Sequence, residues 1–93
     1  MDNIKSLLEY LDSKDMSKMF RSDLLLTWDK SRDEIDALLG TAQALKAIRD
    51  AGFSSRVFDS GIAVSIFRDK STRTRFSFLS AANMLGLAVQ DLD

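Results

Sequence analysis

The sequence predicts an α/β fold, a three-layer arrangement of a parallel sheet with flanking helices. One observation is the order strand, helix, strand over about thirty residues in the C-terminal half, which is typical of a βαβ unit and therefore of parallel strands. The other is a capped, amphipathic helix before it, in residues 32–50, whose apolar stripe suits packing on a sheet.

The composition of the 93-residue chain indicates a small globular protein. Hydrophobic residues make up 45% and charged residues 29%, as in ordinary folded domains. The net charge of -1 provides no overall positive field for nucleic acid. Cysteine and histidine are absent, which excludes disulfides, thiol nucleophiles and histidine bases or ligands from this stretch. With no signal-like or membrane-spanning apolar run, we expect a cytoplasmic protein that binds no membrane.

The first thirty residues predict less regular structure. Residues 1–20 read as a loosely amphipathic helix followed by a polar connection. Residues 23–27 are short and apolar, and periodicity does not decide between a strand and a buried turn. Trp28, with Phe53 and Phe58 further on, is most simply a packing residue.

The helix over residues 32–50 has signals at both ends. Ser31 is the expected N-cap, and Glu34 three residues later completes a capping box. Apolar residues then recur at helical spacing. Gly52 stands just past the end, where helices often place a left-handed glycine.

The C-terminal half predicts two strands joined by a helix. Residues 62–67 (Ile-Ala-Val-Ser-Ile-Phe) read as a buried strand. A helix closed by Gly86 follows, and residues 87–92 read as a second strand. Because two or three strands with both faces to cover make a poor independent sheet, we expect this chain to be the N-terminal part of a larger protein, or to be covered by a partner.

The most informative run is Ser71-Thr72-Arg73-Thr74-Arg75, where the second of these helices begins. A helix start already carries about half a positive charge and unpaired N–H groups. Guanidiniums there are unfavourable unless an anion binds, so the run predicts a phosphate-like ligand. Arg73 and Arg75 lie about 200° apart around a helix, so one should bind the anion while the other holds the turn or meets a neighbouring element.

Other interpretations of this run stay open. The run has no glycine and is not a Walker A loop. It could be a solvated turn, a contact for RNA or protein phosphates, or a scaffold whose arginines pair with carboxylates at a subunit interface. Asp59, Asp91 and Asp93 are most simply surface or strand-end residues.

Residues 67–78 (Phe-Arg-Asp-Lys-Ser-Thr-Arg-Thr-Arg-Phe-Ser-Phe) resemble the carbamoyl-phosphate motif of the aspartate and ornithine carbamoyltransferases, or transcarbamylases. The resemblance covers roughly residues 24–93 and is closest to the YgeW type. It implies transfer of a carbamoyl group from carbamoyl phosphate to the amine of an amino acid or related compound, without metal or organic cofactor. By position it implies that the phosphate is bound by four residues: Ser71, Thr72, Arg73 and Thr74.

The resemblance also assigns further roles. Arg73 would polarise the carbamoyl group and act as the catalytic residue, whereas Arg75 would be structural. Residues 1–93 would form the N-terminal part of a carbamoyl-phosphate-binding domain, inactive alone because the amino-acid-binding domain is absent. Family members are trimers, so a homotrimer is expected. The resemblance also implies a role in amino acid metabolism. Leu79 stands where the family usually has Glu, and a non-catalytic phosphate-binding or structural paralogue is the alternative.

Overall fold

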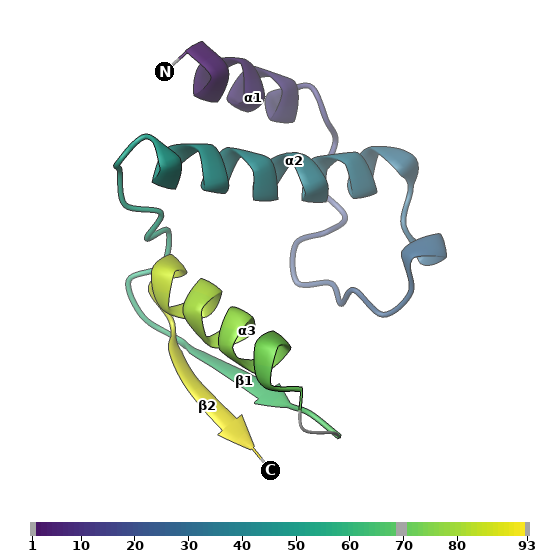
Figure 1. The fold of residues 1–93 in the computed structure, drawn as a ribbon. Helices are drawn as coiled ribbons and strands as arrows, with labels where there is room; N and C mark the ends of the chain where they lie inside the picture. The colour runs from purple at the N-terminus through teal and green to yellow at the C-terminus, as the bar shows by residue number, and fades with distance from the viewer. Residues whose placement is uncertain (1, 69–70, 93) are drawn as a thin grey trace. The chain divides into compact units, whose positions relative to one another are not determined.

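The computed structural model describes residues 2–68 and 71–92, and the chain divides into two compact units, one ending at Phe53 and the other beginning at Ser54. The N-terminal unit and the C-terminal unit hold three elements each (Figure 1). In chain order the elements are α1 (Asp2–Asp12), the short 3-10 helix η1 (Thr27–Asp29), α2 (Arg32–Asp50), β1 (Ile62–Ile66), α3 (Thr72–Leu85) and β2 (Ala88–Leu92). Among the described residues, no helix combines the length and apolar character needed to cross a bilayer.

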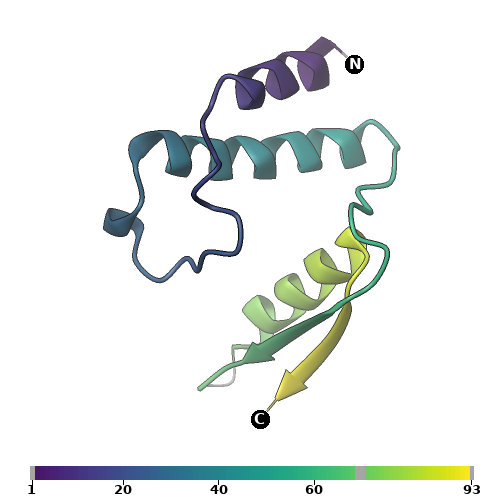
Figure 2. The same cartoon turned by 180° about the vertical axis from the view of Figure 1, so that it is seen from behind.

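Helices α1 and α2 lie side by side in the N-terminal unit, as both views show (Figures 1 and 2). Ala37, Gly40 and Ala44 of α2 are buried. They follow one another at helical spacing, and their small size allows α1 to approach closely. A Cβ added at Gly40 would lie 3.0 Å from the Leu11 side chain, which shows how closely the helices approach. The predicted helix near the N-terminus is confirmed, and it ends at Asp12.

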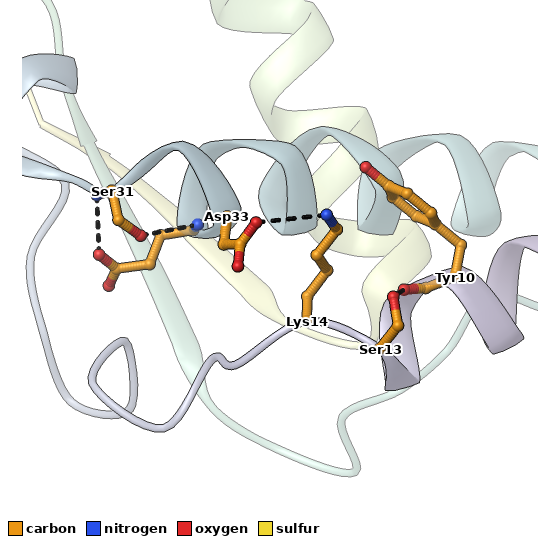
Figure 3. A network of polar contacts seen from close by, with 6 residues as sticks. Tyr10, Ser13, Lys14, Ser31 and Asp33 are labelled. Carbon is orange, nitrogen blue, oxygen red and sulfur yellow. Dashed lines mark hydrogen bonds and ion pairs between the residues drawn. The ribbon is translucent and has the colours of Figure 1, made fainter.

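Both predicted ends of α2 are confirmed. The Ser31 hydroxyl accepts a hydrogen bond from the Glu34 N–H at 3.1 Å, and the Ser31 N–H donates to the Glu34 carboxylate at 2.9 Å (Figure 3). This reciprocal capping box holds the pKa of Glu34 below its ordinary value, chiefly through the Ser31 N–H. At the other end Gly52 has φ +89°, and its N–H donates to the Arg49 carbonyl at 2.9 Å. The local signals therefore set the bounds of this helix.

A small polar network ties the end of α1 to the start of α2 (Figure 3). The Lys14 ammonium lies 3.3 Å from an Asp33 carboxylate oxygen and 4.9 Å from the centre of the Tyr10 ring. The Asp33 carboxylate raises the pKa of Lys14. Ser13 donates to the Tyr10 carbonyl at 2.6 Å. A partly exposed ion pair is expected to stabilise a protein little, and this one joins the segment after α1 to the first turn of α2.

The segment between these helices differs from the prediction. Residues 23–27 form neither a strand nor a buried turn, because residues 23–26 are irregular and exposed and Thr27 begins η1. Leu25 and Trp28 are more than three-quarters exposed. Phe53 and Phe58 are exposed as well. The interpretation of the three aromatic side chains as packing residues is therefore wrong for the described chain. They belong to connecting segments and η1, outside the packed faces of the main helices and strands.

The C-terminal unit is the predicted βαβ unit. β1 and β2 pair in parallel, from Ile62 opposite Ala88 to Ile66 opposite Leu92. α3 packs against both strands (Figure 1). The predicted fold class, α/β with a parallel sheet and helices, is confirmed.

The burial predicted for the first strand is confirmed on one face only. Successive side chains of a strand point to opposite faces. Ser65 faces α3 and is 7% exposed, whereas Ile62 and Ile66 on the other face are 73% and 71% exposed. Within the described residues of this unit α3 is the one helix, so it covers one face of the two strands.

Gly86 joins α3 to β2 through a left-handed conformation, with φ +104°. Its N–H donates to the Asn83 carbonyl at 3.1 Å, and the following N–H of Leu87 donates to the Ala82 carbonyl at 3.0 Å. The last helical carbonyl, of Leu85, accepts from the N–H groups of residues 57 and 58 at 3.1 and 2.9 Å. The loop before β1 is thereby fixed to the end of α3.

Candidate functional site

The candidate site is the start of α3, beyond the carboxyl end of β1. Ser71 is the N-cap residue, and its carbonyl accepts the first helical hydrogen bond, from the Arg75 N–H at 2.8 Å. The N–H groups of Thr72, Arg73 and Thr74 therefore precede the first intrahelical donor and point out of the helix end. This is the placement that the sequence predicts for them.

The N–H donors in the first turn of α3 have no capping acceptor among the described residues of the protein. The Ser71 side chain makes no capping hydrogen bond there, and no acidic residue stands in the described first turn. Thr72, Arg73 and Thr74 are exposed, and Ser71 is half-buried. Hydroxyl, guanidinium and N–H donors thus gather at the positive end of a helix, an arrangement that can bind an anion.

Arg75 has a different environment from Arg73. Its guanidinium forms an ion pair with the Asp91 carboxylate on β2, and both side chains are about 30% exposed. The guanidinium also lies 6.0 Å from the centre of the Phe67 ring. The prediction that one of the two arginines meets a neighbouring element is therefore confirmed for Arg75.

Asp91 is more than the surface or strand-end residue that the sequence suggests. Its carboxylate also accepts a hydrogen bond from the Ser65 hydroxyl at 2.7 Å. Ser65 and Asp91 stand directly opposite each other in the parallel register, on the face that α3 covers. A polar residue inside an otherwise apolar strand, Ser65, is the signal that could have pointed to a polar partner across the sheet.

The Arg75 guanidinium, and next the Ser65 hydroxyl, hold the pKa of Asp91 below its ordinary value of 3.8. A carboxylate with a depressed pKa stabilises the folded state at neutral pH, because the unfolded state binds protons more readily in acid. That contribution is complete above about pH 5 and is lost as the pH falls below 3.8 through the folded-state pKa.

We therefore expect wild type and Asp91→Asn to differ in stability in a pH-dependent way. Wild type should be more stable at pH 7, and the difference should shrink progressively below about pH 4 as Asp91 takes up its proton. Urea denaturation of both proteins between pH 3 and 7 measures this. A difference that stays constant across that range would contradict an ionised, paired Asp91.

A hollow of about 330 Å³ opens between the first half of α3 and the strand ends. Its lining is mixed, because the two strands contribute polar residues and α3 contributes both polar and apolar ones. The lining residues are Ser65, Thr72, Arg75, Phe76, Leu79 and Asp91. Thr72 thus belongs both to the hollow and to the helix start. In the described part of the chain, no three side chains of the metal-binding types His, Cys, Asp and Glu are grouped to hold a metal ion.

These features define an α/β protein whose donor groups gather at a helix start beyond a parallel strand. Residues 22–93 match the family model described as aspartate/ornithine carbamoyltransferase, carbamoyl-P binding domain. The chain belongs to the aspartate/ornithine carbamoyltransferase family, and the predicted resemblance is confirmed.

Three relatives illustrate the similarity. The chain is 48% identical over all 93 of its residues to "Putative carbamoyltransferase YgeW" of Escherichia coli strain K12, covering 23% of that protein. It is 44% identical over 64 residues, 69% of the chain, to 21% of the aspartate carbamoyltransferase catalytic subunit of Methanosarcina barkeri. It is 36% identical over 75% of its length to 24% of the ornithine carbamoyltransferase of Thermococcus kodakarensis. The chain thus spans less than a quarter of the length of these relatives.

Proposed function

We propose that this chain supplies the carbamoyl-phosphate site of a carbamoyltransferase. The complete protein would transfer the carbamoyl group of carbamoyl phosphate to the amine of an amino acid or related compound. Residues 1–93 would be the N-terminal part of the carbamoyl-phosphate-binding domain, and a further domain would bind the amine. We extend the proposal to a cytoplasmic homotrimer.

The main support for this proposal is that the two arginines have different environments. The Arg75 guanidinium pairs with Asp91 at the strand ends, whereas Arg73 stands exposed in the first turn beside outward N–H groups. A phosphate at this helix end would meet N–H donors, three hydroxyls and one guanidinium capable of a bidentate contact. Membership of the family supports carbamoyl phosphate as the source of that phosphate.

In the proposed reaction, the amine lone pair attacks the carbamoyl carbon and forms a C–N bond. The C–O bond to phosphate breaks, the departing phosphate takes the electron pair of that bond, and it accepts the proton that the amine nitrogen loses. Negative charge grows on the carbamoyl oxygen and on the leaving phosphate. Arg73, beside both, would stabilise that charge more strongly in the transition state than in the ground state. Ser71, Thr72 and Thr74 would hold the phosphate in position.

Two measurements on the wild-type, full-length protein test the proposal. Carbamoyl phosphate is titrated calorimetrically beside inorganic phosphate, and a panel of amino acids and other amines is then incubated with carbamoyl phosphate. Carbamoylated product is detected by mass spectrometry. Reactions without protein are the control, because free carbamoyl phosphate decomposes to cyanate, which carbamoylates amines unaided.

Each result has a clear meaning. Binding together with a protein-dependent product supports the transferase. Binding without product for any amine favours the non-catalytic, phosphate-binding paralogue. No binding by folded wild-type protein would mean that the motif persists as architecture, and the transferase proposal should then be dropped.

A further inference from the structure

Three side chains connect both strands of the C-terminal unit to the first turn of α3. The Ser65 hydroxyl donates to Asp91 at 2.7 Å, and the Asp91 carboxylate pairs with the Arg75 guanidinium. We call this set the Ser65–Asp91–Arg75 cluster. Ser65 is 7% exposed, and among the described residues it is the polar one that is buried. The cluster thus links a buried strand position to the edge of the candidate site.

The cluster holds the residue that starts the helical hydrogen bonding. The Arg75 N–H makes the first helical bond, to the Ser71 carbonyl at 2.8 Å. Fixing the Arg75 side chain against the strands therefore fixes the rotation of the first turn about the helix axis. Since Arg73 lies about 200° away around the helix, this rotation directs Arg73 away from the strand side.

We propose that Ser65 and Asp91 are positioning residues for the anion site, acting through Arg75. This inference rests on the proposed function and adds residues to its site. Asp91 sets the orientation of the first turn and so the approach of Arg73 to the phosphate. Ser65 holds the Asp91 carboxylate in place, because its hydroxyl donates a hydrogen bond to one of the two carboxylate oxygens.

Charge gives the cluster a second effect. The Arg75 guanidinium stands near a helix end that is already positive, beside the hollow that Arg75 and Thr72 line. Asp91 compensates this charge at the strand edge and thus reserves the exposed face of the turn for the ligand.

The test compares Asp91→Asn, Asp91→Glu and Ser65→Ala in the full-length protein, measuring kcat and the KM for carbamoyl phosphate. A misplacement of a fraction of an ångström should raise KM or lower kcat about tenfold in Asp91→Asn. Asp91→Glu, which keeps the charge, should recover most of this loss. Ser65→Ala should give a smaller loss in the same direction. Unchanged kinetic constants in Asp91→Asn, with only a lower Tm, would overturn the inference.

The matched control is Asp33→Asn, which removes an equally charged partner from the Lys14 ion pair in the N-terminal unit. It should leave both kinetic constants unchanged. If wild type neither binds nor reacts, the proposed function fails, and the positioning role is then tested by hydrogen exchange at the Arg75 amide. Faster exchange in Asp91→Asn but not in Asp33→Asn supports it, and equal exchange in all three proteins overturns it.

Discussion

Arg73→Ala is expected to lower turnover of carbamoyl phosphate by about 100-fold to 1,000-fold, the usual effect of removing one donor to a developing oxyanion. In its proposed role, the Arg73 guanidinium contacts both the carbamoyl oxygen and the leaving phosphate. Affinity should fall as well, since a bidentate guanidinium–phosphate contact is lost. Steady-state rates of product formation give kcat and KM, and calorimetric titration gives the binding constant.

Two variants make this prediction specific. Arg73→Lys keeps the charge but loses the planar fork, so it should fall between wild type and Arg73→Ala. Arg49→Ala removes an exposed arginine from the last turn of α2, and it should match wild type in both constants. Wild-type turnover in Arg73→Ala would mean that another cation serves the phosphate, and the assignment of Arg73 as the catalytic residue would be wrong.

The sequence predicted best those elements whose signals are local. The bounds of α2 follow from a capping box at Ser31 and a left-handed Gly52, both readable within a few residues. The βαβ order in the C-terminal half was equally readable, from two short strand-like runs on either side of a helix that ends at Gly86. Burial was predicted less well, as Trp28 and Ile62 show, because burial depends on what packs against a segment and not on the segment alone.

The candidate site divides in the same way. Its helix start was predictable because a strand followed by Ser-Thr-Arg-Thr-Arg is one continuous stretch of chain. The role of Asp91 was not predictable, because its pairing with Ser65 joins residues 26 positions apart and depends on the register of two strands. A register shift of one residue would turn Asp91 to the opposite face of the sheet. The sequence predicts that the two arginines point in different directions, but it does not reveal the carboxylate that pairs with Arg75.

Gly86→Ala is expected to destabilise the C-terminal unit by roughly 2 to 5 kcal/mol, a large share of a typical domain's stability. Gly86 has φ +104°, where an L side chain is strained. An added Cβ would also lie 2.0 Å from the Phe58 carbonyl oxygen. That oxygen belongs to the backbone, so the loop itself must move, and the hydrogen bonds of residues 57 and 58 to Leu85 would be disturbed. Urea denaturation of the full-length protein measures the loss.

Gly52→Ala is the matched control because it separates conformational strain from steric contact. Gly52 also has a positive φ, of +89°, but a Cβ there would meet no described atom within 4 Å. Gly52→Ala should therefore lose stability only through conformational strain, by about 1 kcal/mol. If the two variants lose equal stability, the approach of Phe58 to Gly86 does not constrain the fold. A clearly larger loss in Gly86→Ala would show that this backbone contact fixes the turn joining α3 to β2, and with it the strand that carries Asp91.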